Sequence, residues 1–464
     1  MSIMPVSPFS PFPSAQSCQQ DDAACAHALP GAGDKVVVVG SGRSGLAACR
    51  LLKGRGCEVA LLEANPAGVR PEVQEEMTRL GVRIEAGAHT PEQFAGADFV
   101  VPSPGAPLEH LLEIMGKKRE FPLASEEGPC ILAETELAWR CLDGEKIIAV
   151  TGTSGKTTTV HLMTAMLKEA GFSVFLGGNV GVPLSEYVTG KAAGKGRCDV
   201  IVLEISSFQL QTCLTLHPDV AVLMNITPNH LDYHKDMAEY VAAKMRLFAC
   251  QTEKDLAIVP EEWQELYRRA GFKAELKKAE PCGRFKKTHL IGAHNALNAE
   301  IAFQAVQRLG VDEGAAQAAV AKFAPLPHRL EFVAEKEGVM YVNDSKCTTV
   351  SSLETALKAM DRPVLLLCGG RWKGGDLEAL IPLVREKVRC AAGFGESEQI
   401  FGSAWKDAVP MQWFPTMEPA FAWLNSQAES GDVVLLSPAT ASFDLYKGMA
   451  FRGQHFKDLV GKLA

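Results

Sequence analysis

Residues 146–167 read KIIAVTGTSGKTTTVHLMTAML: an apolar run, then eight small or polar residues, then a run with helical spacing. A buried strand that passes into a helix through such a loop predicts a P-loop, whose backbone N–H groups wrap phosphates. Lys156 would place a cation on the β and γ phosphate oxygens, and Thr157 would ligate Mg²⁺. The first glycine of the usual pattern falls at Val150, so this loop is a variant that is shorter at its start. ATP or GTP is the predicted ligand, although no N-K-x-D guanine-type segment is present, and the predicted contacts are Gly152, Thr153, Ser154, Gly155, Lys156, Thr157 and Thr158.

Apolar runs followed by helical patterns continue on both sides of this loop. They predict an α/β protein with three domains, because strands that alternate with helices form parallel sheets. The expected parts are a flexible tail (1–33), a Rossmann-like domain (34–144), a central P-loop domain (145–327) and a C-terminal Rossmann-like domain (328–464), with a Pro-rich hinge near residue 327. The predicted strands are 36–40, 59–63 and 98–105, then 146–152, 199–206 and 219–226, then 339–344, 363–370, 390–395 and 432–439.

The composition excludes several classes of protein. With 464 residues, 47% hydrophobic and 22% charged, the chain is an ordinary multidomain globular protein. Its net charge of −8 provides no basic field for nucleic acid. No apolar run is long enough to span a bilayer, so no membrane insertion is expected. The 13 cysteines show no C-x-x-C pair or disulfide framework, which predicts a reducing cytoplasm.

A second phosphate loop lies near the N-terminus. Residues 40–45, GSGRSG, follow a strand and open a helix, and Glu63 ends the next strand. This is the dinucleotide fingerprint in its usual context, and it predicts a bound diphosphate rather than nicotinamide in particular. The alternative is a tight β–α turn without a ligand.

Several further motifs accompany the P-loop in a fixed order. They are NITPNHLDYH (225–234), AAKMRLF (242–248), GAHNALN (292–298), PHRLE (327–331), NDSK (343–346) and LSPATASFDLYKG (436–448). Together with GSGRSG they resemble the Mur ligase family of ATP-dependent amino-acid ligases, from Lys35 to about residue 460. The resemblance implies a cytoplasmic step of peptidoglycan precursor synthesis, and so a part in cell shape and division. It implies that ATP phosphorylates a carboxylate and that an amine then attacks the acyl phosphate.

The resemblance also assigns roles around ATP and Mg²⁺. Thr157, Glu204, His230 and Lys244 would hold one or two ions, and Lys156, His230, Lys244 and Lys346 would be catalytic. Spacing alone predicts that Lys244 is a solvated helix lysine, whereas the family implies that it is carbamylated. The implied contacts to the nucleotide are Asn295, Asn298, Arg329 and Asp344, for which interdomain ion pairing is the alternative at Arg329 and Lys346. His234 fits a structural or substrate-side role.

Two substrates follow from the same resemblance, and a monomer is expected. The ATASFD segment favours D-glutamate as the incoming amino acid, held by Lys346, Thr348, Lys373, Ser442 and Phe443. UDP-N-acetylmuramoyl-L-alanine would be held by Arg43, Ser44, Glu63, Ser103, Gly105, Asn179, Ser206 and Gln209. The chain departs from the family pattern at Asn229, Ala64-Asn65, Pro260 and Thr349.

Three alternatives remain open at this stage. A nicotinamide-dependent oxidoreductase would explain GSGRSG but has no use for the P-loop lysine. A P-loop switch would bind nucleotide without amide chemistry. Within the family, ligases that add L-alanine, a diamino acid or a dipeptide, and the folate polyglutamate ligase, are the other candidates, although the D-N-P-R stretch typical of the diamino-acid enzyme is absent.

Overall fold

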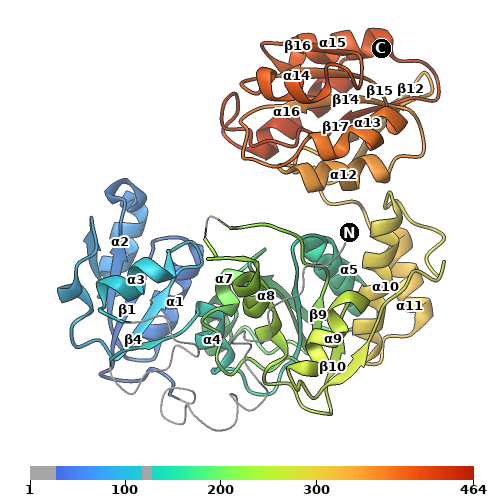
Figure 1. The fold of residues 1–464 in the computed structure, drawn as a ribbon. Helices are drawn as coiled ribbons and strands as arrows, with labels where there is room; N and C mark the ends of the chain where they lie inside the picture. Colours follow the sequence, from blue (N-terminus) through green and yellow to red (C-terminus); the bar gives the residue numbers. More distant parts are fainter. Residues whose placement is uncertain (1–27, 118–127, 232, 464) are drawn as a thin grey trace. The chain divides into compact units, whose positions relative to one another are not determined.

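The computed structural model describes residues 28–117, 128–231 and 233–463. The first of its sheets is centred on strand β1 (Lys35–Val39). Val36 and Val38 belong to one buried cluster and Val37 and Val39 to another, as expected for a strand that is covered on both faces. The strand order is β3-β2-β1-β4-β5, all parallel. Strands β1 and β4 of this sheet are labelled in Figure 1. The other elements of this part are β2 (Glu58–Glu63), β3 (Arg83–Ala86), β4 (Phe99–Pro102), β5 (Cys130–Ile131), α1 (Arg43–Gly54), α2 (Pro71–Arg79), α3 (Leu108–Ile114), α4 (Glu134–Trp139) and the short 3₁₀ turns Pro66–Gly68 and Pro91–Phe94.

The second sheet carries the P-loop at the end of β6 (Lys146–Thr151). Its order is β11-β10-β9-β6-β8-β7, all parallel, so β6 lies between β8 and β9. Parallel strands end at one edge, and therefore the loops after β6, β8 and β9 meet there. The remaining elements are β7 (Val174–Gly178), β8 (Val200–Glu204), β9 (Val220–Leu223), β10 (Leu256–Ile258), β11 (Glu275–Lys277), α5 (Lys156–Glu169), α6 (Leu184–Ala192), α7 (Ser207–Leu210), α8 (Met237–Met245), the 3₁₀ turn Arg246–Phe248, α9 (Glu261–Arg269), α10 (Ala293–Gln307) and α11 (Glu313–Lys322).

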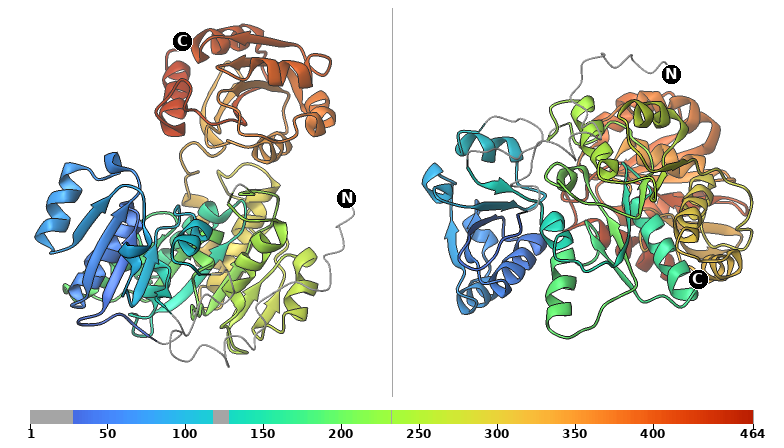
Figure 2. Two further views of the ribbon diagram at one scale, coloured as in Figure 1. Left: turned by 60° about the vertical axis from the view of Figure 1, so that its left-hand side comes forward. Right: turned by 90° about the horizontal axis from the view of Figure 1, so that it is seen from below.

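The third sheet has the order β12-β13-β17-β14-β15-β16, and only its edge strand β12 is antiparallel. Helices cover both faces (Figure 2), because alternate residues of the strands enter two separate cores. Val342, Leu366 and Leu435 point to one core, and Tyr341, Leu365 and Val434 to the other. The elements are β12 (Glu331–Lys336), β13 (Val339–Asn343), β14 (Val364–Gly369), β15 (Val388–Phe394), β16 (Met411–Phe414), β17 (Val433–Leu436), α12 (Val350–Lys358), the 3₁₀ turn Glu378–Leu380, α13 (Ile381–Lys387), α14 (Glu398–Trp405), α15 (Met417–Gln427) and α16 (Met449–Gly461).

The predicted α/β class with three sheets is confirmed. The chain forms two compact units: the described residues up to Glu280 together with Glu300–Ala319, and Pro281–Ala299 together with the chain from Val320 onward. The first unit contains two of the sheets, and the second contains the third. The division into three domains at residues 144 and 327 stays a prediction, and most of the predicted tail lies outside the described residues.

The described cysteines are mainly free thiols: Cys49, Cys57, Cys141, Cys198, Cys213, Cys282, Cys347, Cys368 and Cys390. Cys130 and Cys250 are disulfide-bonded, which differs from the expectation of reduced thiols throughout. Within the ranges that the structure describes, no helix is long and apolar enough to cross a bilayer.

Candidate active site

The P-loop is shaped by two glycines with backbone angles that other residues rarely adopt. Gly152 has φ 145° and Gly155 has φ 84°. A Cβ atom on Gly152 would lie 2.8 Å from Cβ of Met224, so only glycine fits between β6 and the residue after β9. Asn225 ties the loop down, because its carbonyl accepts from the peptide N–H of Thr153 and its side-chain oxygen accepts from that of Ser154, at 3.0 and 2.9 Å.

Lys156 opens helix α5 and reaches back over the loop. Its ammonium group donates to the carbonyl oxygens of Gly152 and Thr153, at 2.7 and 3.0 Å. The N-terminus of α5 directs its first N–H groups toward the same loop. This arrangement of cation and helix dipole suits a polyphosphate, and the predicted contacts of the loop with ATP stay a prediction.

Lys244 lies against the P-loop and not in solvent, so the interpretation from spacing alone is wrong. The side chain is buried, and Nζ donates to the carbonyl of Gly152 at 3.0 Å and lies 4.4 Å from the centre of the Tyr240 ring. Burial and the neighbouring charge of Lys156 hold the pKa of Lys244 well below its usual value, while Glu204 opposes this effect. A lysine amine in this environment is readily neutral.

Glu204 ends strand β8 beside this group and has an unused acceptor. Oε1 accepts from the amide of Asn179 at 2.8 Å, whereas Oε2 is buried and has no hydrogen-bond partner. A buried carboxylate oxygen of this kind costs free energy unless a cation or donor reaches it. The residues therefore fit the Mg²⁺ that the P-loop pattern implies.

The ion would have few protein ligands. Among the residues that the structure describes, no three His, Cys, Asp or Glu side chains form a metal-binding group. Mg²⁺ commonly takes one or two carboxylates and completes its shell with water and substrate phosphates. Glu204 and the Thr157 hydroxyl suit this mode.

His230 lies in the loop that follows β9, in a left-handed backbone conformation with φ 57°. Its carbonyl accepts from the N–H groups of Tyr233 and His234, at 3.1 and 2.9 Å. Its ring lies 4.8 Å from that of Phe208 and 6.4 Å from that of Tyr240. The structure thus brings His230 into the neighbourhood of Lys244, as the resemblance implies.

The first glycine-rich loop depends on close packing. A Cβ atom on Gly45 would lie 2.0 Å from the carbonyl oxygen of Gly40, so the helix can approach the strand only with glycine there. The carboxylate of Glu63 fixes the loop through three hydrogen bonds. Its Oε2 accepts from the N–H and the hydroxyl of Ser41, and its Oε1 accepts from the N–H of Asn65. Although burial raises its pKa, these hydrogen bonds hold the pKa of Glu63 below its ordinary value overall. Its predicted contact with the uridine stays a prediction.

Several other residues predicted for the UDP-sugar form hydrogen bonds within this unit. Arg43 donates to the carbonyl of Gly181, and the Ser103 hydroxyl donates to that of Gly40. Ser206 and Gln209 form a capping box on α7. Asn179 holds Glu204, a role that the sequence did not suggest. Ser44 lies in the first turn of α1 and Gly105 in the loop after β4, so the members of the predicted set follow the ends of several parallel strands of the two sheets.

The second unit holds the remaining nucleotide candidates. Asn295 and Asn298 are buried on α10 and bond to each other at 3.1 Å. Arg329 lies in the segment before β12. Asp344 follows β13 and accepts from the N–H of Leu330 and the hydroxyl of Ser437.

The candidates for the amino acid follow three neighbouring strands of the third sheet. Lys346 and Thr348 come after β13, Lys373 after β14, and Ser442 and Phe443 after β17. These strands are parallel, so the five side chains lie in loops at one edge. Phe443 is 66% exposed, which suits a residue that closes over a ligand.

Arg452 is a functional candidate that sequence reasoning missed. It is fully buried on α16 and donates to Ser345 Oγ and to the carbonyls of Ser345, Thr440 and Ala441. Burial lowers its pKa to about 10. It fixes the two loops that carry Lys346 and Ser442, and nothing in the surrounding sequence distinguishes it from a solvated helix arginine.

Asp344 gives a testable pH dependence. Burial raises its pKa from 3.8 to about 7, so this group favours folding at low pH and that contribution is lost as the pH rises through 7. Relative to Asp344→Asn, the unfolding free energy of the parent should therefore fall from pH 5 to 7.5, by on the order of 1 kcal/mol per pH unit. Urea unfolding at several pH values measures this, with the exposed Asp361→Asn as control. Equal pH slopes in the parent and Asp344→Asn would contradict it.

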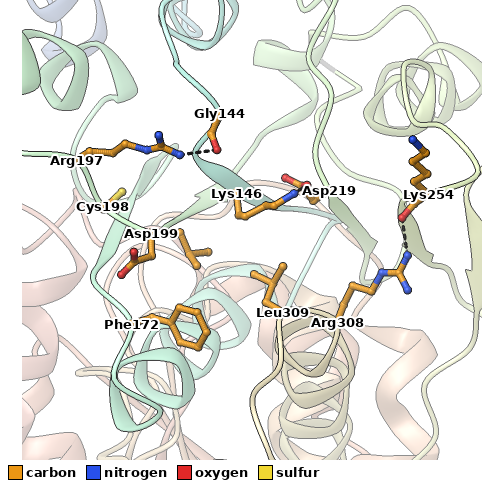
Figure 3. Close-up of a pocket in the computed structure, with 11 residues that line it drawn as sticks. Gly144, Lys146, Phe172, Arg197, Cys198, Asp199, Asp219, Lys254, Arg308 and Leu309 are labelled. Atoms are coloured by element: carbon orange, nitrogen blue, oxygen red, sulfur yellow. Dashed lines mark hydrogen bonds and ion pairs between the residues drawn. The ribbon is translucent and has the colours of Figure 1, made fainter.

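A separate cavity of about 830 Å³ lies where β6, β8 and β9 begin (Figure 3). Its charged groups already have neighbours: Arg197 donates to the Gly144 carbonyl at 2.6 Å, Lys146 pairs with Asp219 at 2.7 Å, and Arg308 donates to the Lys254 carbonyl. The P-loop follows the other end of β6. This cavity is therefore not part of the candidate active site.

A P-loop, a strand-end carboxylate and a buried lysine in a three-sheet α/β chain are the parts of an ATP-dependent ligase. Sequence models of the Mur ligase middle domain and of the Mur ligase, glutamate ligase domain match residues 150–281 and 328–440. The chain belongs to the Mur ligase family. The UDP-N-acetylmuramoylalanine--D-glutamate ligase of Desulfovibrio desulfuricans is 54% identical over 434 residues, which cover 93% of this chain and 97% of that protein. The ligase of the same name from Lawsonia intracellularis is 45% identical over 426 residues, 92% and 94% of the two chains.

Solved structures support the fold. The MurF ligase from Thermotoga maritima in complex with ADP has a TM-score of 0.58 at 17% identity, covering 88% of this chain and 96% of that one. MurF from Acinetobacter baumannii has a TM-score of 0.55 at 16% identity, covering 97% and 98%. At such identities the likeness concerns the fold alone.

Proposed function

We propose that this protein is the ATP-dependent ligase that adds D-glutamate to UDP-N-acetylmuramoyl-L-alanine in the cytoplasm. The observation that carries the proposal is the 54% identity to the D-glutamate ligase of Desulfovibrio desulfuricans over nearly both chains. The geometry supports it, because Lys156, Glu204 and Lys244 come together at the P-loop edge of the second sheet.

The chemistry follows from the weakness of a carboxylate as an electrophile. The substrate carboxylate oxygen attacks the γ-phosphorus of ATP, the bond to the β-phosphate oxygen breaks, and ADP leaves. The amine of D-glutamate then attacks the acyl carbon, the amine loses a proton, and phosphate leaves as the amide forms. Lys156 and the P-loop N–H groups orient the phosphates and offset their charge.

Lys244 is proposed to act as a carbamate. Its neutral amine adds to CO₂ and releases one proton, which turns a neutral group into an anionic one. Thr157, Glu204, His230 and the carbamate would then share one or two Mg²⁺ ions, so that each ion has only a few protein ligands, and the ions would offset the charge of the phosphates. The buried, unpartnered Oε2 of Glu204 supports a cation at this place.

The remaining assignments extend the same proposal. Asn295, Asn298, Arg329 and Asp344 contact ATP, Lys346 serves both phosphate transfer and D-glutamate, and the protein acts as a monomer. D-Glutamate has two carboxylates, which suit two lysines, Lys346 and Lys373.

The direct test is phosphate release from ATP with UDP-N-acetylmuramoyl-L-alanine. D-Glutamate should give release and a ligated product, whereas L-glutamate, L-alanine and meso-diaminopimelate should give a rate lower by about a hundredfold or more. Turnover with another amino acid instead would be consistent with the Mur ligase family but would refute D-glutamate as the substrate. Nucleotide hydrolysis that needs no amino acid would favour the P-loop switch.

A further inference from the structure

His234 is a buried histidine that the reaction above does not use. Its side chain is 0% exposed. Nε2 lies 2.9 Å from the Ser207 hydroxyl, and Nδ1 lies 3.1 Å from Oε1 of Glu239. A proton on Nδ1 lets the ring donate to Glu239 and accept from Ser207, while the amide of Gln211, 3.3 Å from Nδ1, donates to the same oxygen of Glu239 at 2.7 Å.

The two partners of His234 come from different segments of the candidate metal site. Ser207 begins α7, directly after the strand that ends at Glu204. Glu239 lies in the first turn of α8, the helix that carries Lys244. The peptide N–H of His234 donates to the carbonyl of His230 at 2.9 Å. One residue therefore joins the three segments that supply Glu204, His230 and Lys244.

Other bonds also hold the loop between β9 and α8: the Tyr233 hydroxyl donates to the carbonyl of Ala106, and the N–H of Lys235 donates to Glu239. His230 has a left-handed backbone, which costs free energy in a residue other than glycine. Its imidazole is on the exposed side of the loop. Phe208 packs beneath it, with ring centres 4.8 Å from His230 and 5.5 Å from His234. His234 is thus a buried polar residue of the loop itself that contacts both α7 and α8, beside the direct bond from Gln211 to Glu239.

We propose that His234 is a positioning residue for Mg²⁺, which sets the relative placement of Glu204, His230 and Lys244 through Ser207 and Glu239. The inference rests on the proposed function for the role of the ion. Groups that orient metal ligands typically change metal affinity by about 10- to 100-fold when they are removed.

The test replaces His234 with phenylalanine, which keeps a ring of similar size and removes both hydrogen bonds. Mn²⁺ binding is measured by electron paramagnetic resonance with the nonhydrolysable analogue AMP-PNP. We expect the Mn²⁺ affinity to fall, and the Mg²⁺ concentration for half-maximal ligation to rise, by about tenfold. The KM for D-glutamate should stay within about twofold, since that pocket lies in the other unit.

Three further variants sharpen the result. His234→Asn keeps an N–H group near Glu239 and should recover part of the affinity. Ser207→Ala and Glu239→Gln each remove or weaken one link and should shift Mn²⁺ binding less than His234→Phe. The matched control is His217→Phe, because His217 also pairs with a carboxylate in this unit, Asp255 at 2.7 Å, and should leave Mn²⁺ binding unchanged.

A folded His234→Phe variant with the parent's Mn²⁺ affinity and Mg²⁺ dependence would overturn the proposal. If that variant does not fold, Mn²⁺ binding to Ser207→Ala and to Glu239→Gln tests the proposal instead, and unchanged binding in both variants overturns the proposal. Mn²⁺ binding needs no amino acid. A chain that shows these shifts but does not ligate D-glutamate would refute the proposed function and leave the positioning role intact.

Discussion

Lys156→Ala should lower the rate of ligation by about a thousandfold and leave the melting temperature nearly unchanged. The ammonium group donates to the two loop carbonyls of Gly152 and Thr153. The fold of the loop depends instead on Gly152 and on Asn225, which the substitution leaves in place. Removing the cation therefore removes charge neutralisation of the transferring phosphate and little packing.

The measurement is phosphate release with saturating UDP-N-acetylmuramoyl-L-alanine and D-glutamate, together with thermal unfolding. Lys168→Ala is the matched control, because Lys168 is exposed at the other end of the same helix. It should keep the parent's rate. Near-normal turnover by Lys156→Ala would refute the assignment of the P-loop.

The sequence predicts the fold well where the apolar runs are long. VVVVG, DVIVLEIS and DVVLLSPA become β1, β8 and β17, because a strand buried on both faces must be apolar throughout. The sequence does not predict β5, which has two residues, because so short a run carries no periodicity. It also does not predict β12, the partly exposed antiparallel edge, where polar and apolar residues are mixed.

The residues of the candidate site also differ in how far the sequence predicts them. Residues inside a motif, such as Lys156 and Glu204, follow from the order of strand, loop and helix. The burial of Lys244 does not, because the Gly152 carbonyl and the Tyr240 ring that cover it are brought there by tertiary packing. Arg452 escapes for the same reason, because Ser345, to whose carbonyl it donates, is 107 residues away in the sequence. A structural role for His234 is among the expectations from the sequence, but its contact with Ser207 is not.

Lys244→Ala should lower ligation by about a thousandfold, and a small carboxylate such as formate should restore part of the rate. Burial and the charge of Lys156 hold the pKa of an unmodified Lys244 amine low, so a simple amine here would be neutral and would offer Mg²⁺ no negative charge. A carbamate would instead offer oxygens to Mg²⁺. Deleting the side chain leaves a space beside Gly152 in which a free carboxylate can supply those oxygens.

The comparison with Lys156→Ala makes the result specific. Formate should not rescue that variant, because the missing group there is a cation. Depleting CO₂ should lower the parent's rate, and added bicarbonate should restore it, while Lys244→Ala should respond to neither. The free energy of unfolding of Lys244→Ala should fall only by the amount that lost packing accounts for, because a buried amine with a lowered pKa contributes no ion pair. Two results together would contradict the carbamate: neither formate nor acetate restores the rate of Lys244→Ala, and the rate of the parent does not depend on CO₂. Lys244 would then act as an amine that is hydrogen-bonded to Gly152.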